Sequence, residues 1–138
     1  MFYSKNLKNY NIDHCFFSRK NGISKGIYEG LNCGIGSKDQ KQSVEKNLEI
    51  VSEKFSIKKD SLLLMHQTHS NKVEIVNQNK KINKINCDAM LTTNNKIALG
   101  VLTADCVPIL LYERNKEIVG CIHAGWKGAV NGIIENTL

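Results

Sequence analysis

The sequence predicts an α+β fold in which mixed β-sheets are layered with a few helices. Three observations carry this prediction: a series of short apolar segments, one amphipathic segment with helical periodicity, and a glycine-rich, turn-forming stretch near the N-terminus. With 138 residues and 41% hydrophobic content, the chain is long enough to bury a core. We therefore expect a single domain that spans residues 1–138.

The N-terminal part is expected to hold one strand, a turn region and one long helix. The apolar stretch 14–19 predicts a first strand, and the glycines of 20–36 predict turns. These glycines do not match a dinucleotide-binding fingerprint, because no helix pattern follows the first of them. Residues 37–55 predict a helix that Ser37 or Asp39 caps. Its apolar side chains recur at helical spacing on one face: Val44, Leu48, Val51 and Phe55.

The rest of the chain predicts a run of strands and a final helix. The strand-like segments are 61–69, 72–76, 97–103, 107–112 and 117–123. The asparagine-rich stretch 77–86 predicts a surface loop. Pro108 predicts either the start of a strand or a strand at a sheet edge. The stretch 127–138 predicts a helix, because Val130, Ile133 and Ile134 are spaced for one.

Composition and charge argue against export, membrane insertion and nucleic-acid binding. The N-terminus has no apolar leader, no apolar run is long enough for a bilayer, and the five cysteines are an odd number. Free thiols and a cytoplasmic location are therefore expected. The net charge of +6 comes from scattered basic residues, mostly lysine. Aromatic residues do not alternate with them as a stacking platform requires, so we expect neither a membrane nor a nucleic acid as partner.

Three polar groups end or interrupt the apolar strands, and they are the candidate functional residues. Because alternate residues share a face of a strand, His123 and Cys121 point the same way. Asp105 and Cys106 lie in a break between two apolar strands, and the stretch 66–70 carries two histidines after another strand. The spacing of these residues is not diagnostic, and it also fits small buried cysteines and hydrogen-bonded histidines that have only a structural role. If the residues do form a functional site, two kinds of site remain open. One is a His₂Cys metal site with an open fourth position, and the other is a cysteine nucleophile with a histidine base and an aspartate orienter.

Four motifs in fixed order resemble the laccase-domain family, also called YfiH-like or multicopper polyphenol oxidase proteins. The motifs are MHQTHSNKV, CDAMLT, LTADCVPILLY and HAGWKG. The stretch 16–36 is similar to the N-terminal signature of that family. The resemblance implies a YfiH-like cysteine-hydrolase-type fold and a zinc-dependent purine nucleoside enzyme. Such an enzyme combines phosphorolysis of adenosine, inosine and methylthioadenosine with deamination of adenosine.

The same resemblance assigns site residues. His69, Cys106 and His123 match the metal ligands of the family, so we expect them to be catalytic and to hold Zn²⁺, with copper as the alternative. Asp88 and Asp105 lie in matched motifs, and each is a candidate for orienting a ligand, for acid–base catalysis or for capping a turn. The remaining cysteines match no ligand and are expected to be small buried residues, and His66 is expected to be a structural neighbour.

The HAGWKG motif also predicts an anion site, since a glycine turn and a cation stand just before a helix. Phosphorolysis requires bound phosphate, and Gly125, Lys127 and Arg19 are the candidates to bind it. Lys127 stands where family members usually have arginine, so it offers charge without the planar fork. Trp126 could stack on a purine base, although a lone tryptophan more often lies in a core.

The C-terminal end is expected to be incomplete. Family members usually continue well beyond Leu138, and Ser70 stands where they usually have glycine. The strands 107–112 and 117–123 are apolar on both faces, whereas two helices are few to cover them. We therefore expect exposed apolar surface or an unpaired sheet edge, compensated by self-association or by a missing C-terminal segment.

Three alternatives to the nucleoside enzyme remain. A metal-free cysteine hydrolase would use Cys106, His123 and Asp105, with cell-wall precursors as its substrates. A copper-dependent phenol oxidase is less favoured, because the chain has only four histidines and one His₂Cys set cannot supply a multicopper site. A non-enzymatic product that binds or regulates a partner is the third alternative.

Overall fold

The helices and strands fall into two units, each of which is described by itself. A computed structural model describes residues 1–77 and 85–138. The first unit comprises Met1–Lys59, and the second comprises Asp60–Leu138. Among the described residues, every helix is too short or too polar to cross a bilayer.

One long helix, α1 (Lys41–Lys54), forms the core of the first unit. The predicted apolar face is confirmed, since its buried side chains include Val44, Leu48 and Val51. The predicted caps are wrong: the N-cap is Gln40, and no side chain caps the helix. Ser37 and Asp39 instead accept hydrogen bonds from backbone N–H groups that precede the helix, those of Asp39 and Gln40 respectively.

The glycine-rich stretch 20–36 is held by one buried side chain of α1. Asn47 is fully buried, and its Oδ1 accepts a hydrogen bond from Ile23 N at 2.9 Å. Its Nδ2 donates to Ser24 Oγ and to the carbonyl oxygen of Asn32, both at 2.9 Å. The amide thus bonds to a segment that has little regular backbone pairing of its own.

The N-terminal segment contains two short turns and an irregular stretch where the sequence predicts a strand. η1 (Lys5–Leu7) and η2 (Gly26–Tyr28) are single 3₁₀ turns. Within the predicted strand 14–19, only Phe16 pairs, in an isolated bridge with Phe2. The prediction is wrong because this pairing does not continue into a ladder.

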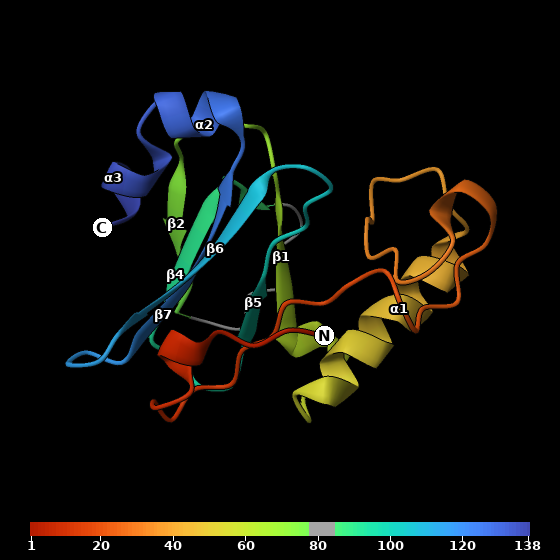
Figure 1. The fold of residues 1–138 in the computed structure, drawn as a ribbon, viewed down its shortest axis with the longest axis horizontal. Coiled ribbons are helices and arrows are strands. Elements are labelled where there is room, and N and C mark those ends of the chain that lie inside the picture. Colours follow the sequence, from red (N-terminus) through yellow and green to blue (C-terminus); the bar gives the residue numbers. More distant parts are fainter. Residues whose placement is uncertain (78–84) are drawn as a thin grey trace. The chain divides into compact units, whose positions relative to one another are not determined.

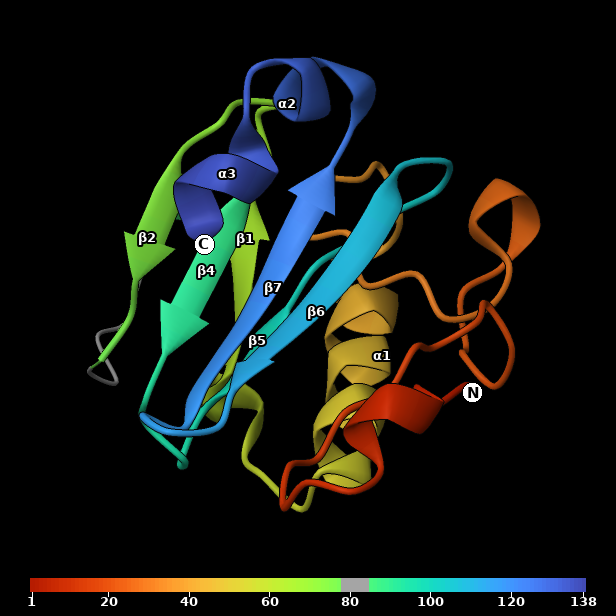
Figure 2. The ribbon, with the colours of Figure 1, turned by 60° about the vertical axis from the view of Figure 1, so that its left-hand side comes forward.

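Two β-sheets form the framework of the second unit (Figures 1 and 2). After a 3₁₀ turn, η3 (Lys59–Ser61), the parallel three-stranded sheet has the order β3-β1-β5 and consists of β1 (Leu62–His66), β3 (Ile85–Asn86) and β5 (Ala98–Gly100). The four-stranded sheet has the order β2-β4-β7-β6 and consists of β2 (Val73–Ile75), β4 (Ala89–Thr92), β6 (Val107–Glu113) and β7 (Ile118–Ala124). β2 runs parallel to β4, whereas β7 is antiparallel to both of its neighbours. The predicted α+β class with mixed sheets is confirmed.

The four-stranded sheet packs on both of its faces, as the apolar pattern of β7 predicts. Cys121 belongs to the core cluster that also contains Met65 of β1, so it faces the three-stranded sheet. The next residue, Ile122, packs with Ile133 of α3 (Ile133–Thr137) on the opposite face. The alternation of side chains along β7 therefore produces two separate cores, one on each side of the sheet.

Three features of this unit differ from what the sequence predicts. The segment CDAMLT was not assigned to a strand, yet it supplies β4, which pairs with both β2 and β7. The predicted helix 127–138 is split into α2 (Trp126–Val130) and α3, because Gly132 between them adopts a left-handed backbone with φ 80°. The predicted loop 77–86 ends in β3, and its residues 78–84 lie outside the described part of the chain.

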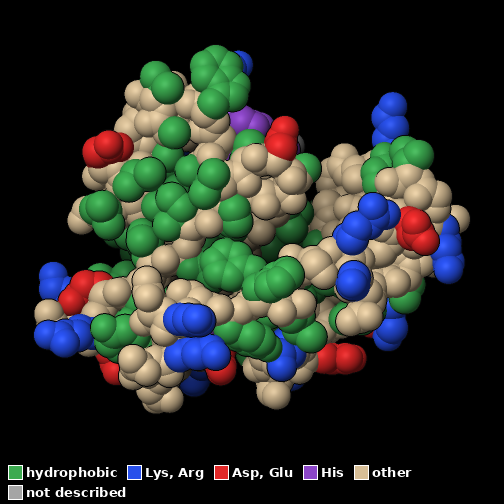
Figure 3. Space-filling view, in the orientation of Figure 1, with side chains coloured by type: hydrophobic (Ala, Val, Ile, Leu, Met, Phe, Trp, Pro, Cys, Tyr) green, Lys and Arg blue, Asp and Glu red, His purple; other side chains and the backbone are tan. Residues whose placement is uncertain are grey.

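Apolar side chains remain exposed near the C-terminal end of the second unit. Ile75 on β2 is 68% exposed, and Val130 and Leu138 are 80% and 87% exposed. Hydrophobic side chains gather over α3 and the neighbouring strands (Figure 3). β2 and β6 end the four-stranded sheet, so within residues 1–77 and 85–138 their outer edges carry no further strand. The predicted exposed apolar surface and the predicted edge position of Pro108 in β6 are confirmed.

Candidate metal centre

Strand pairing brings residues that are distant in sequence to one end of the four-stranded sheet. β6 and β7 are antiparallel, and Pro108 pairs with His123, so Cys106 just before β6 lies beside the end of β7. β4 is also antiparallel to β7, and the backbone N–H of His123 donates to the carbonyl oxygen of Asp88 at 2.7 Å. The end of β7 is therefore flanked by a thiol on one side and a carboxylate on the other.

The loop after β1 is tied to the segment that leads to Cys106. The side-chain amide of Gln67 donates to the carbonyl oxygen of Leu102 at 2.6 Å and accepts from Leu102 N at 2.8 Å. This pair of bonds places His69, two residues later, near the same sheet end. Sequence reasoning missed Gln67, because a side chain that pairs with backbone 35 residues away leaves no periodic signal.

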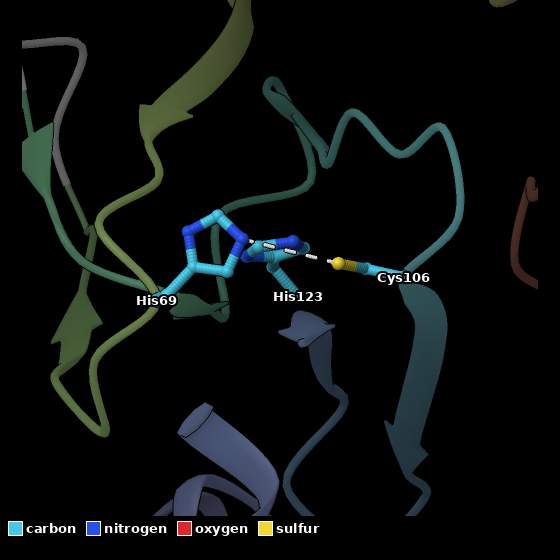
Figure 4. Close-up of side chains that lie close together, drawn as sticks. All are labelled: His69, Cys106 and His123. Atoms are coloured by element: carbon cyan, nitrogen blue, oxygen red, sulfur yellow. Dashed lines mark hydrogen bonds between the residues drawn. The ribbon is translucent and has the colours of Figure 1, made fainter. Parts of the chain in front are cut away.

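Three side chains converge at this end: His69, Cys106 and His123. Their ligand atoms all lie within 4.8 Å of one another, and the side chains point toward a common centre (Figure 4). Cys106 Sγ lies 3.9 Å from His69 Nε2, and the two imidazole rings are edge-on with centroids 4.8 Å apart. His123 is buried, Cys106 is half-buried and His69 is exposed. The group is thus anchored in the sheet and accessible on the His69 side.

The carboxylate of Asp88 supports this group from behind. Its Oδ1 lies 2.8 Å from His123 Nδ1, and the side chain is fully buried. Burial acts to raise the pKa of this carboxyl, but hydrogen bonds from His123, Ser70 and Thr68 outweigh burial and lower the pKa to about 2. Asp88 is therefore a carboxylate at neutral pH, and it both orients a histidine and binds the backbone of a turn.

The absence of a side chain at Gly125 provides the space in which the three side chains converge. A Cβ at this position would lie 2.8 Å from His69 Cδ2 and 3.2 Å from Cys106 Sγ, which is closer than packed side chains allow. At Gly128 a Cβ would lie 2.9 Å from the carbonyl oxygen of Ser70. The two glycines therefore let α2 approach the His69 loop closely.

The donor set fits a metal ion with an open coordination position. Two imidazoles and one thiolate are ligands that zinc and copper accept. Tetrahedral zinc places such ligand atoms about 3.4–3.6 Å apart, close to the 3.9 Å between Cys106 Sγ and His69 Nε2. The exposed side of His69 leaves space for a water or a substrate as fourth ligand, and the missing Cβ of Gly125 leaves room at the centre.

Asp105 and His66, the other polar candidates near this site, lie outside the convergent group. Asp105 is exposed, and its Oδ1 lies 3.7 Å from Cys106 Sγ. Burial and the negative charge of Asp105 both raise the pKa of the Cys106 thiol. His66 is exposed at the end of β1 and does not belong to the metal-binding group.

Of the predicted phosphate-binding residues, Gly125 and Lys127 belong to the second unit and Arg19 belongs to the first. Gly125 lies against the metal-binding group, whereas Lys127 is exposed and its Nζ lies 5.5 Å from the ring centroid of Trp126. Trp126 is 72% exposed, so the expectation that it lies in a core is wrong. Its position is on the outer side of α2, which instead buries Gly128. Arg19 belongs to the first unit, where it donates to the carbonyl oxygen of Glu29 at 2.7 Å.

All five cysteines are free thiols, but their reactivities should differ. Burial raises the pKa of Cys33 and of Cys87 to about 11, and that of Cys121 to about 12. A pKa near 11 instead of 9.0 leaves about 100-fold less thiolate, the species that reacts. Cys15 is half-buried, which differs from the buried position expected from the sequence.

We therefore expect iodoacetamide at pH 8 to modify Cys15 and Cys106 in the native protein, and Cys33, Cys87 and Cys121 only after unfolding. Peptide mass mapping of quenched samples checks this. Addition of Zn²⁺ should slow the modification of Cys106 while that of Cys15, the internal control, stays constant. Rapid native modification of Cys121 would contradict the packing described for β7.

Comparison with known proteins agrees with these motifs and this geometry. Residues 13–138 match the family model described as multi-copper polyphenol oxidoreductase laccase. The chain belongs to this family. It is 32% identical over 133 residues to a purine nucleoside phosphorylase of Corynebacterium glutamicum, and the match covers 95% of this chain and 54% of the relative. It is also 32% identical over 136 residues to the purine nucleoside phosphorylase YlmD of Bacillus subtilis, covering 93% of this chain and 49% of YlmD.

Solved structures share the fold. The crystal structure of YfiH from Bacillus licheniformis superposes with a TM-score of 0.81 at 26% identity, covering 86% of this chain and 48% of YfiH. A Neisseria meningitidis protein superposes with a TM-score of 0.75 at 33% identity, with the same coverage of both chains. The YfiH-like fold expected from the sequence motifs is confirmed, and the chain spans about half the length of these relatives.

Proposed function

We propose that this chain carries the metal centre of a zinc-dependent purine nucleoside enzyme. Its reactions would be phosphorolysis of adenosine, inosine and methylthioadenosine, and deamination of adenosine. The convergence of His69, Cys106 and His123 within 4.8 Å is the observation that carries the proposal. The name purine nucleoside phosphorylase, which the relatives bear, supports the reaction class. The unpaired cysteines favour a reducing, cytoplasmic setting.

In this proposal the metal supplies a Lewis acid that makes water a usable nucleophile near neutral pH. In phosphorolysis, a phosphate oxygen forms a bond to C1′ of the ribose, the bond from C1′ to the purine nitrogen breaks, and the base leaves with a proton. In deamination, water adds at C6 of adenine and ammonia leaves. The residues of this chain hold the reacting groups together, which is a large part of the rate enhancement in such reactions.

Gly125 and Lys127 are the proposed contacts for phosphate. The backbone at Gly125 lies next to His69 and Cys106, so an anion there would be adjacent to the reacting centre. The ammonium of Lys127 is exposed and needs only a rotamer change to leave the Trp126 ring. Arg19, the third phosphate contact expected from the sequence, belongs to the first unit, where its guanidinium bonds to Glu29.

A metal-free cysteine hydrolase is the second candidate, and one observation favours it. Cys106, His123 and Asp88 form a thiol–imidazole–carboxylate series, in which Asp88, and not Asp105 as expected from the sequence, orients His123 through a 2.8 Å contact. Two facts weigh against this candidate. The pKa of Cys106 is raised rather than lowered, and His69 has no task in such a triad. Zinc is favoured over copper because the chain has only four histidines.

The test is a metal analysis combined with a nucleoside assay of the purified chain. We expect one zinc per chain after purification without added metal. We also expect phosphate-dependent release of free base from inosine, lost after chelation and restored by Zn²⁺. Liquid chromatography of base and ribose 1-phosphate measures the reaction. Turnover that survives chelation would favour the hydrolase, and copper in place of zinc would favour the oxidase.

A further inference from the structure

Asp88 contacts both segments that carry the histidines of the metal centre. One contact sets which nitrogen of the His123 ring carries hydrogen, and the other holds the turn that positions His69. We propose that Asp88 is a positioning residue that presents both His69 and His123 to the metal. This role rests on the metal centre proposed above. It adds the residue that positions the two imidazoles so that each can bind the metal. Within the described residues no buried side-chain nitrogen or oxygen lacks a hydrogen-bond partner, so the contacts of Asp88 belong to a fully bonded network.

The first contact selects the protonation pattern of the His123 ring. A carboxylate only accepts hydrogen bonds, so the 2.8 Å contact between Asp88 Oδ1 and His123 Nδ1 places the ring hydrogen on Nδ1. The lone pair of Nε2 then faces the group formed with Cys106 and His69. The backbone N–H of His123 also bonds to Asp88, at 2.7 Å, so ring and strand are held by the same residue.

The second contact holds the turn that carries His69. Three consecutive backbone N–H groups point at the Asp88 carboxylate, from Thr68 at 3.2 Å, His69 at 3.0 Å and Ser70 at 2.7 Å. His69 has φ 56°, a left-handed conformation that is unfavourable for a residue with a Cβ. Convergence of these N–H groups on a buried anion offsets that cost. The Gln67–Leu102 bonds bring the start of this loop to the sheet end, and the Asp88 carboxylate holds the turn in the conformation that sets the His69 ring beside Cys106.

Ser70 strengthens the same arrangement. Its hydroxyl donates to Asp88 Oδ2 at 2.7 Å, in addition to its backbone N–H. Asp88 thus accepts hydrogen bonds from three backbone N–H groups of the turn and from the hydroxyl groups of Thr68 and Ser70. A neutral side chain of the same size offers fewer acceptors.

Asparagine at position 88 is the sharpest test because it keeps the shape and replaces one acceptor with a donor. If its amide nitrogen faces His123, it donates to Nδ1 and moves the ring hydrogen to Nε2, the ligand atom. If its amide nitrogen faces the turn, it opposes the backbone N–H groups of 68–70. Either orientation should weaken Zn²⁺ binding by about 10–100-fold, as loss of the partner of a ligating histidine commonly does.

The experiment compares the wild type with Asp88→Asn and with a charge-matched control, Glu74→Gln, whose side chain is exposed on β2. Zn²⁺ affinity is measured by competition with a chromophoric chelator. Long-range ¹H–¹⁵N spectra of the metal-free proteins report which ring nitrogen of His123 carries hydrogen. We expect an Nδ1–H ring in the wild type, weaker binding in Asp88→Asn, and affinity within about twofold of wild type in Glu74→Gln.

Two results would overturn the inference: an Nε2–H ring at His123 in the metal-free wild type, or a folded Asp88→Asn protein that binds Zn²⁺ as the wild type does. If Asp88→Asn does not fold, the position of the ring hydrogen on His123 in the metal-free wild type decides whether Asp88 positions this histidine. A wild type that binds no Zn²⁺ but shows the Nδ1–H ring would refute the metal centre while leaving the positioning of His123 intact. The two proposals are therefore judged separately.

Discussion

Replacing Cys106 with alanine is expected to remove both the bound metal and the nucleoside activity. The thiolate is the only sulfur ligand of the proposed centre, and two imidazoles without it hold zinc weakly. Activity should fall on the order of 10³-fold or more, because several kcal/mol of metal assistance are lost. Metal analysis and inosine phosphorolysis measure the two effects on the same sample.

The matched control for this variant is Cys15→Ala, which removes a half-buried thiol from the other unit. It should keep its zinc and its turnover. If Cys106→Ala loses activity while chelators leave the wild type unaffected, Cys106 acts as a nucleophile and the hydrolase is the correct function. A Cys106→Ala protein that retains zinc would show that the metal lies elsewhere.

Adding one methyl group at Gly125 is expected to disrupt the centre without disturbing the fold. The backbone of Gly125 has φ −73° and ψ 159°, which alanine adopts freely, so the effect is steric and local. The new Cβ would lie 2.8 Å from His69 Cδ2 and 3.2 Å from Cys106 Sγ, and one of these side chains must move. We expect Zn²⁺ affinity to fall about tenfold or more.

Gly36→Ala is the matched control, because a Cβ there meets nothing within 4 Å. The thermal midpoint of the metal-free protein should change little in either variant, whereas the rise on Zn²⁺ addition should shrink only in Gly125→Ala. Equal stabilisation by Zn²⁺ in both variants would mean that the three side chains do not gather around an ion at this position.

Several elements could be predicted because their signals are local. The helix α1 follows from an apolar face with a 3.6-residue period, and β7 follows from a continuous apolar run that ends at His123. The three convergent residues follow from motifs, since each stands at or near a strand end. Gly132 separates α2 from α3 with a φ of 80°, and the local signal for this break is a glycine within the helical pattern.

Other elements could not be predicted, because they depend on pairing between distant segments. The residues 14–19 have strand-like composition, yet only Phe16 finds a partner. β4 is short and carries a weak pattern, and it becomes a strand because β2 and β7 flank it on both sides. Trp126 is exposed because α2 turns its glycine face toward the His69 loop. The hydrophobic periodicity of the sequence does not predict that orientation.

The sequence by itself determined the α+β class and the main strands, since apolar periodicity is written along the chain, whereas the residues of the proposed centre were expected from the resemblance of its motifs to the laccase-domain family. Only the tertiary structure decided which carboxylate forms hydrogen bonds with the two histidines. Asp88 and Asp105 are equivalent candidates as motifs, but antiparallel pairing places Asp88 against His123, at 2.8 Å, and leaves Asp105 exposed beside Cys106. The tertiary structure also showed that His69 and Cys106 occupy the space that a Cβ at position 125 would need. Both outcomes depend on contacts between residues far apart in sequence, which local propensity does not specify.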